Sequence, residues 1–472
     1  MDPLDDEVGP ALDRVQRYSL SHLAALGESR AATNPRSRDP LGLPAAGTGA
    51  LAAIDELIAR YGDEFSGSPG PRYWGFVNGG VTPAALAGDW LASAIDQNAQ
   101  LNGDGAAAFI EYETLGMLRT LFGLPETFHG VFVTGGTMAN HVGLGIALQR
   151  LGARRGIDAS QHGVAALGEV RIVTGESHSS IAKSAAMLGL GRDAVTQVPR
   201  LDGREAVDPR AMAEVLQAHR DAALIIVANA GTVLTGDFDD IGALADLAER
   251  FGAHLHVDGA FGAFAACSPA HRHLVEGMER GDTVASDGHK FLNVPFDSGF
   301  VFARALEPQI EMFKNVSSYQ APPRLDPQHL IHLSPQNSRR LRALPAWISL
   351  RAYGAGGYRA IVERCCGLAA ALGERIAAAD GFRLLAPVRY NVVAFQLVRP
   401  DGEGASADET GAFLDRIRDD GRVFVTPGNL RGTPCVRLAM VNWSTTDRDI
   451  DIAMSAFEDC WARQDAGSSV KT

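Results

Sequence analysis

The turn Thr134-Gly135-Gly136-Thr137 is one of four segments whose residue types could do chemistry. It joins an apolar run to a helical pattern. Such a turn presents free backbone N–H groups and the positive end of a helix dipole, which suit an anion such as phosphate. Glycines at this kind of turn also serve tight backbone geometry, and the segment matches neither a Walker A loop nor GxGxxG. Alone, it indicates either a phosphate cradle or an ordinary tight turn.

The other three segments offer a histidine, a carboxylate and a lysine. His178 opens a helical pattern, Asp258 ends an apolar run, and Lys290 follows a Gly-His turn. Asp258 could pair with a cationic ring nitrogen at the carboxyl end of a strand, or cap the next turn. Burial among the surrounding apolar residues would favour the neutral lysine amine that forms Schiff bases, whereas turn lysines are ordinarily solvated. His178 could cap its helix, be an ordinary surface residue, or lie flat on a planar cofactor.

A sheet is needed to bring these segments together, and the sequence predicts one. Between about residues 105 and 305, short β-branched runs alternate with helical patterns, which indicates a mainly parallel sheet covered on both faces. The predicted strands are 131–134, 171–174, 224–228, 254–257 and 300–302, and the predicted helices are one ending at 150, 179–188 and 241–251.

The chain divides into three predicted parts. Residues 1–70 are polar and interrupted by Pro and Gly, with one amphipathic stretch at 51–60, so we expect an N-terminal extension. Residues 71–345 form the large domain. Within it, 315–338 carries four prolines and no apolar period, which predicts a mobile lid or binding loop. Residues 346–472 alternate helix and strand and predict a small α+β domain.

Composition excludes several classes of function. The 472 residues include 43 Lys+Arg and 56 Asp+Glu, a net charge of −13, so neither nucleic acid nor an anionic membrane is an expected partner. No window has the ~18 apolar residues of a membrane span, and the acidic start lacks the basic region of a signal peptide. The five cysteines show no CxxC spacing. We expect a cytoplasmic protein with reduced thiols and no metal.

Together, the segments resemble the group II amino-acid decarboxylases, the aromatic-amino-acid and glutamate decarboxylase family of fold-type I pyridoxal-phosphate enzymes. The resemblance covers about residues 71 to 450. It implies an α/β fold with a mainly parallel, seven-stranded sheet between helices, a small α+β C-terminal domain, and a homodimer contacted by the N-terminal extension. The matching segments are 133–140, 176–183, 229–240, 256–262, 287–293 and 338–347.

The resemblance also implies roles for single residues. Lys290 would hold pyridoxal 5'-phosphate, Asp258 would keep its ring nitrogen protonated, and His178 would stack on the ring. A protonated ring accepts the electrons released when the bond between Cα and the carboxylate breaks, so the coenzyme performs the difficult step. The residues expected at or near the phosphate are Gly135, Gly136, Thr137, His289, Thr232 and Ala260.

Two departures from the family pattern bear on the chemistry. Asp287 stands where Asn is common, which would bring a negative charge near the phosphate. Family members protonate the substrate carbon with a loop Tyr from the partner subunit, but here the loop has only Tyr319, near its start. His329 and His332 stand near the expected place, and His332 aligns better with it. A histidine suits proton donation, although loop histidines are by default solvated.

The segment 71–80 resembles the family's side-chain pocket. Tyr73, Trp74 and Phe76 favour an aromatic or apolar L-amino acid over a dicarboxylate, which would need a cationic partner. The same three residues could be ordinary core aromatics. The sequence thus predicts a substrate class and not a particular amino acid.

We expect decarboxylation of an amino acid to its amine and CO₂. The missing loop Tyr leaves open an aldehyde-forming decarboxylation with oxidative deamination, or another pyridoxal-phosphate lyase. A catalytically silent scaffold is a further alternative, against which the presence of Lys290, Asp258 and His178 argues. A nucleotide-binding protein is disfavoured because the Walker and GxGxxG patterns are missing.

Overall fold

The computed structural model describes residues 8–100, 105–316 and 323–467. Its centre is a seven-stranded sheet with strand order β1-β7-β6-β5-β4-β2-β3. Strand β7 runs antiparallel to β1 and β6, and the other neighbouring pairs are parallel. The predicted mainly parallel sheet is confirmed. Its strands are β1 (His129–Val133), β2 (Val170–Thr174), β3 (Val195–Gln197), β4 (Ala223–Asn229), β5 (His254–Asp258), β6 (Thr283–Asp287) and β7 (Gly299–Ala303).

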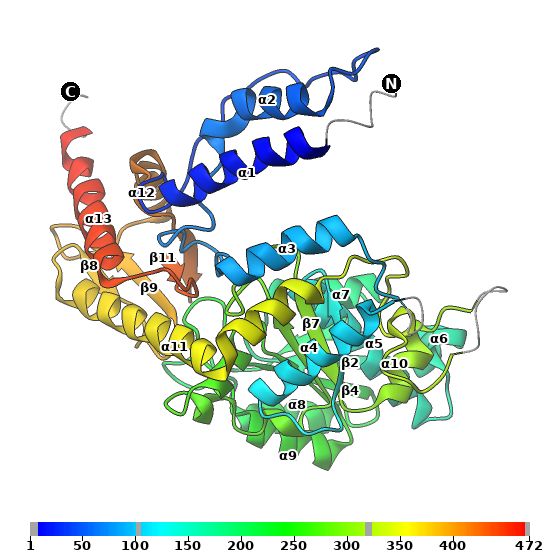
Figure 1. Ribbon diagram of the computed structural model, residues 1–472. Coiled ribbons are helices and arrows are strands. Elements are labelled where there is room, and N and C mark those ends of the chain that lie inside the picture. Colours follow the sequence, from blue (N-terminus) through cyan, green and yellow to red (C-terminus); the bar gives the residue numbers. More distant parts are fainter. Residues whose placement is uncertain (1–7, 101–104, 317–322, 468–472) are drawn as a thin grey trace.

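Helices cover both faces of this sheet (Figure 1). Strand β4 shows why: Ile225 and Val227 join the cluster under α5 and α7, whereas Leu224 and Ile226 join the cluster that includes α8 and α9. Alternate side chains point to opposite faces, so a strand that is apolar on both must be covered twice. The helices of this domain are α3 (Pro83–Ile95), α4 (Ala107–Leu121), α5 (Gly136–Ala153), α6 (Ala159–His162), α7 (Ser179–Met187), α8 (Pro209–Ala218), α9 (Ile241–Phe251) and α10 (Leu306–Phe313).

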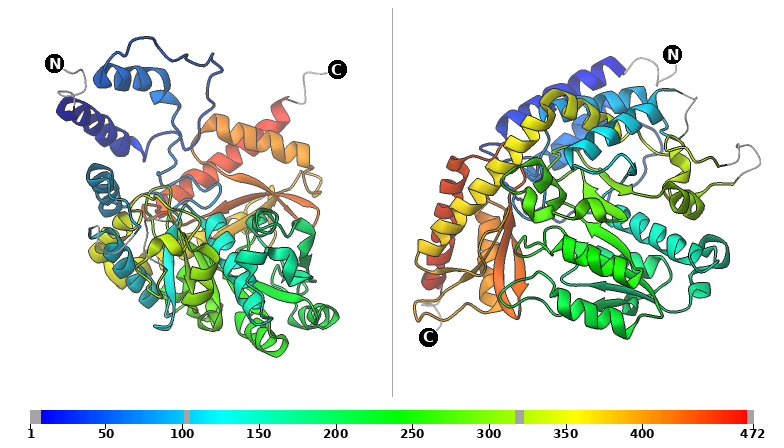
Figure 2. Two further views of the ribbon diagram at one scale, coloured as in Figure 1. Left: turned by 90° about the vertical axis from the view of Figure 1, so that its right-hand side faces the viewer. Right: turned by 90° about the horizontal axis from the view of Figure 1, so that it is seen from below.

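The C-terminal part forms a smaller α+β unit beside the large domain (Figure 2). Its antiparallel sheet has the order β10-β11-β9-β8. Helix α11 (Ala343–Ala378) leads into it and is broken at Gly354, whose φ of 58° separates two helical stretches. The remaining elements are β8 (Phe382–Leu384), β9 (Val392–Leu397), α12 (Ala407–Asp420), β10 (Thr426–Leu430), β11 (Thr433–Ala439) and α13 (Asp447–Gly467).

The N-terminal part contains two helices, although the sequence predicted only the second. Helices α1 (Val8–Ala25) and α2 (Ala50–Tyr61) pack against each other and stand away from the central sheet (Figures 1 and 2). Neither of these two described helices contributes a buried residue. Among the described residues, no helix is long and apolar enough to cross a bilayer.

Part of the stretch 315–338 is packed into the large domain. Residues Leu330–His332 form a single 3-10 turn, and Leu330 and Leu333 are buried. The side chain of Gln309 on α10 donates to the carbonyl of Leu333 at 2.8 Å. The N–H of Ile331 donates to the carbonyl of Gln100 at 3.1 Å. This half of the loop is therefore held by the domain's own hydrogen bonds.

Candidate active site

Lys290 lies in the turn that follows β6, and neighbouring segments hold this turn. The side-chain amide of Asn293 donates to the carbonyls of Lys290 at 3.3 Å and Val441 at 3.1 Å. The N–H of Gly79 donates to the carbonyl of His289 at 2.9 Å. A Cβ on Gly79 would lie 1.8 Å from the carbonyl oxygen of Lys290, so only glycine permits this approach. Segment 71–80 and the C-terminal domain thus meet at the lysine.

Asp258 ends β5 at the carboxyl edge of the sheet and is 6% exposed. Its Oδ2 accepts a hydrogen bond from the side-chain amide of Asn140 at 2.9 Å. Its Oδ1 accepts one from the backbone N–H of Ala260 at 3.2 Å. Both donors stabilise the ionised carboxylate, which is the form that can pair with a protonated ring nitrogen. Ala260 therefore acts here through its backbone.

A chain of buried polar side chains continues from Asn140 away from Asp258. His256 Nε2 lies 2.9 Å from Asn140 Oδ1, and its Nδ1 lies 2.8 Å from Thr283 Oγ1, which is 2.9 Å from His254 Nε2. Because an amide oxygen only accepts, His256 donates from Nε2. Burial lowers the pKa of His256 to about 4 and that of His254 to about 3, so both rings are neutral at neutral pH. The chain thereby orients the Asn140 amide toward Asp258.

His178 is the N-cap of α7. Its Nδ1 accepts from the N–H of Ser180 at 3.2 Å and lies 2.8 Å from the Ser180 hydroxyl, which also accepts from Asn140 at 2.9 Å. Desolvation lowers the pKa of His178, the Asp258 carboxylate opposes this shift, and the Lys290 ammonium adds to it. The imidazole is therefore neutral near pH 7. The capping bond restrains the ring beside Asp258 and Lys290, so capping and stacking on a cofactor are compatible.

The predicted phosphate turn is the start of α5, whose N-cap is Gly135. Its first backbone bond runs from Ala139 N–H to the Gly135 carbonyl at 2.9 Å, so the preceding N–H groups point out of the first turn. Asp287 lies opposite: a Cβ on Gly136 would lie 2.6 Å from its Oδ2. The same oxygen is 2.7 Å from Lys290 Nζ. The helix terminus and the lysine are thus brought together, with a carboxylate between them.

His289 faces the same carboxylate. Its Nδ1 donates to the carbonyl of Ser298 at 2.7 Å, which leaves Nε2 3.7 Å from Asp287 Oδ1. Desolvation lowers the pKa of His289, and the Asp287 carboxylate opposes that shift. Its ring also stacks on Phe296, with 4.4 Å between centroids. His289 is therefore held by its backbone bond and by this stack, with one ring nitrogen toward the helix terminus.

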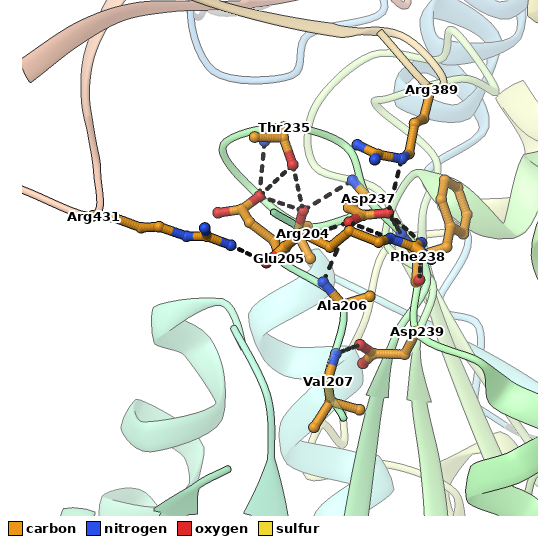
Figure 3. Close-up of polar contacts among 11 residues, drawn as sticks. Arg204, Glu205, Ala206, Val207, Thr235, Asp237, Phe238, Asp239, Arg389 and Arg431 are labelled. Carbon is orange, nitrogen blue, oxygen red and sulfur yellow. Dashed lines mark hydrogen bonds and ion pairs between the residues drawn. The ribbon is translucent and has the colours of Figure 1, made fainter. Parts of the chain in front are cut away.

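The two threonines expected near the phosphate differ in the hydrogen bonds that they make. Thr137 lies in the first turn of α5, and its carbonyl accepts from Ser184 at 3.4 Å. The buried Thr232 hydroxyl donates to Glu205 Oε2 at 2.6 Å and accepts from the N–H of Asp237 at 2.9 Å. Figure 3 shows Glu205 and Asp237 in one polar cluster. The Thr232 hydroxyl proton is thus already bonded to Glu205, a residue that the sequence analysis missed.

The three aromatic residues of segment 71–80 occupy different environments. Trp74 is 1% exposed and donates its indole N–H to the carbonyl of Pro71 at 2.7 Å, so it is a core residue. Tyr73 stacks on Phe424 with 4.6 Å between centroids, and Phe76 lies 6.0 Å from the same ring. Phe76 is 61% exposed. Tyr73, Phe76 and Phe424 form what we call the aromatic face.

Arg437 is a buried cation beside this face that the sequence analysis also missed. Its Nε donates to the carbonyl of Val233 at 2.9 Å, and its Nη1 donates to the carbonyl of Phe76. Desolvation lowers the pKa of Arg437 to about 10, and the nearby Glu205 carboxylate opposes the shift. An arginine inside the otherwise apolar run 435–441 was the available signal.

The loop residues remain predictions as proton donors. His332 is 2% exposed, and its Nδ1 accepts from the N–H of Asn315 at 3.1 Å. Burial lowers its pKa, and the neighbouring His329 adds to this effect. His329 Nε2 lies 3.5 Å from Asp326 Oδ2. Tyr319 lies outside the described residues.

The residues at this site fit pyridoxal phosphate. The first turn of α5 offers backbone N–H groups to a phosphate, and the missing Cβ of Gly136 leaves room beside Asp287. Lys290 would supply the amine, and Asp258 would supply the buried carboxylate for a ring nitrogen. When bound, the coenzyme supplies a protonated ring that accepts electrons from the substrate carbon. The chain's own residues would orient that ring and hold its proton.

Comparisons with known proteins identify the family of this chain. Residues 66–398 match the family model of the pyridoxal-dependent decarboxylase conserved domain. Cysteine sulfinic acid decarboxylase of Rattus norvegicus is 30% identical over 413 residues, which cover 82% of this chain and 81% of that protein. Aromatic-L-amino-acid decarboxylase of Bacillus atrophaeus is 26% identical over 392 residues, 80% of this chain and 79% of that protein.

A solved structure shows the same fold over almost the whole chain. The crystal structure of Oryza sativa TDC with PLP and tryptamine superposes with a TM-score of 0.89 at 21% identity, covering 98% of this chain and 99% of that one. The fold-type I architecture predicted from the sequence is therefore confirmed. The chain belongs to the pyridoxal-dependent decarboxylase family, and it is a pyridoxal-phosphate-dependent amino-acid carboxy-lyase.

Proposed function

We propose that the enzyme removes the α-carboxyl group of an L-amino acid with an aromatic or apolar side chain and releases the amine and CO₂. The aromatic face carries this proposal. Tyr73 and Phe76 lie only a few residues before Gly79, which packs on the carbonyl of Lys290. An aromatic side chain that stacks there gains about 0.5–1.5 kcal/mol per ring pair beyond its area burial.

The environment of Arg437 argues against an acidic side chain. A carboxylate or sulfinate substrate group needs a cation with free donors. Two nitrogens of Arg437 already donate to the carbonyls of Val233 and Phe76, and Glu205 offsets its charge. The same site offers apolar rings to a substrate, so it favours the aromatic or apolar class.

A substrate panel tests this proposal. CO₂ release is measured for phenylalanine, tyrosine, tryptophan and leucine and compared with release from glutamate, aspartate and cysteine sulfinate. We expect kcat/KM to be at least about 100-fold higher for a member of the first group. Phe76→Ala should raise KM for that substrate several-fold, whereas Phe76→Tyr keeps the ring and should not. A preference for cysteine sulfinate would contradict the proposal.

The product is tested in the same reactions. We propose the amine, with a loop histidine or the partner's loop as the proton source at the substrate carbon. Amine, aldehyde, ammonia and H₂O₂ are measured with and without oxygen. Aldehyde that appears with stoichiometric ammonia and H₂O₂ only when oxygen is present would instead assign an oxidative deamination.

We also propose a homodimer in which α1 and α2 cover a second subunit. Helices α1 and α2 expose several large apolar side chains. A cluster of such side chains on a single chain marks an interaction surface. Sedimentation velocity should show a dimer, and Leu12→Asp combined with Leu20→Asp should weaken it and lower activity. A fully active monomer would contradict this proposal. The large exposed apolar residues are Val8, Leu12, Val15, Leu20, Leu51 and Leu57 on α1 and α2, and Trp90, Leu91 and Ile95 on α3.

A further inference from the structure

The carboxylate of Asp287 lies at the N-terminal turn of α5, where the coenzyme's phosphate is expected. Asp287 is 2% exposed, and its Oδ2 would be 2.6 Å from a Cβ on Gly136. Its Oδ1 is buried and has no hydrogen-bond partner among the described residues. A buried acceptor without a donor is costly. This oxygen is therefore available to any group that brings a proton to the helix terminus.

The charged groups around Asp287 come from several elements. Lys290 Nζ lies 2.7 Å from Oδ2, and His289 Nε2 lies 3.7 Å from Oδ1. His178, the N-cap of α7, also interacts electrostatically with both Asp258 and Asp287. Of these, Lys290 carries the one side-chain nitrogen within 3 Å of Asp287 among the described residues. Attaching the coenzyme would use this nitrogen: Nζ would lose a proton and bond to the aldehyde carbon, and the aldehyde oxygen would leave as water.

We propose that Asp287 and the coenzyme's phosphate share a proton, so that Asp287 limits the affinity of the enzyme for its coenzyme and makes that affinity fall as pH rises. Two anions in one buried site do not both stay fully ionised, and the proton belongs to the cluster and not to one member. A phosphate monoester has a second pKa of about 6, so it can retain this proton near neutral pH. The unpartnered Oδ1 then gains the donor that it lacks.

Asp287→Asn gives the decisive comparison because it preserves shape and removes the charge. The full chain is freed of coenzyme and titrated with pyridoxal phosphate between pH 6 and pH 8, following the visible absorption of the bound coenzyme. At pH 8, Asp287→Asn should bind about 10-fold or more tightly than the wild type. The difference should shrink toward pH 6, because the wild type takes up about one more proton on binding. Circular dichroism and thermal unfolding check the fold.

Two further experiments distinguish an effect of Asp287 on the phosphate from an effect on Lys290. In a Lys290→Ala background, where no covalent bond forms, Asp287→Asn should still tighten binding of pyridoxal phosphate. With pyridoxal, which has no phosphate, the gain should vanish. Asp297→Asn is the matched control, since this carboxylate lies near His289 but is 42% exposed and paired with Arg342. It should leave the pH dependence unchanged.

These results decide the proposal without any substrate. Equal or weaker binding by Asp287→Asn at pH 8, or parallel pH profiles, would overturn it. A gain that disappears in the Lys290→Ala background, or persists with pyridoxal, would show that Asp287 acts through Lys290 and would overturn it as well. Because coenzyme affinity is the readout, this proposal and the proposed substrate class fail independently.

Discussion

Asn140→Leu should impair catalysis because Asn140 links Asp258 to the buried polar chain behind it. Leucine has a similar shape but removes the donor to Asp258 Oδ2 and the acceptor for His256 Nε2. A hydrogen bond to a charged group contributes about 1.5–3 kcal/mol. If about 2 kcal/mol of the carboxylate's stabilisation is lost where it pairs with the protonated ring, kcat/KM should fall roughly 30-fold.

The assay combines kinetics with two other measurements. Steady-state CO₂ release gives kcat/KM, and titration with pyridoxal phosphate shows whether the coenzyme still binds. The free energy of unfolding should also fall, by about 1–3 kcal/mol, because the buried N–H of His256 is left without an acceptor. A loss of stability alone would not distinguish a positioning role from general loosening of the core.

Thr283→Val is the control that makes this distinction. Thr283 is as buried as Asn140 and bonds to His256 and His254, but it does not touch Asp258. The variant should lose comparable stability while keeping kcat/KM within about threefold of the wild type, because the bond from Asn140 to Asp258 survives. Near-normal kcat/KM in Asn140→Leu, or an equal loss in Thr283→Val, would refute the reasoning.

Three other predictions concern the lysine, the loop and the buried histidines. Lys290→Ala should abolish turnover and the visible absorption of the covalently bound coenzyme, and an adduct trapped by borohydride on another lysine would contradict this. His332→Phe should lower the ratio of amine to aldehyde more than His329→Phe does; unchanged ratios in both variants and in their combination would reject a histidine donor. Between pH 7 and 5, His254 and His256 take up protons in the unfolded chain but stay neutral in the folded protein, where their pKa values are about 3 and about 4. The free energy of unfolding should therefore fall by about 2 kcal/mol per residue at pH 5, and denaturant titrations of His254→Asn and His256→Asn should show a weaker pH dependence.

The fold was predictable where the residue pattern of an element is independent of its neighbours. Strand β4 is a run of β-branched and aliphatic residues that is buried along its whole length, and the sequence indicates it directly. Strand β6 (Thr283–Asp287) was missed because Thr, Ala, Ser and Asp form no apolar run. Its burial comes from its place between β5 and β7. Helix α1 was missed because it buries no residue within its own described chain.

The residues proposed for the chemistry of the candidate site could be predicted from the sequence, but the residues that hydrogen-bond to them could not. Loops at the carboxyl ends of parallel strands meet at one edge of the sheet, so Asp258 and Lys290 could be placed together from their order alone. Asn140 lies 118 residues before Asp258, and sequence patterns do not report a contact over that separation. Thr232 was expected near the phosphate, yet its hydroxyl bonds to Glu205. Such partners depend on side-chain packing between distant segments.

Three buried carboxylates near this site show why residue type alone does not assign a role. Asp258 accepts a hydrogen bond on each of its two oxygens, so both are already satisfied within the protein. Glu205 accepts three hydrogen bonds on one oxygen and lies near Arg437, so groups of the protein itself balance its charge. In Asp287, Oδ2 pairs with the Lys290 ammonium, and Oδ1 has no donor among the described residues. The number of donors around each carboxylate, which tertiary packing sets, determines which one can still respond to a ligand that brings a proton.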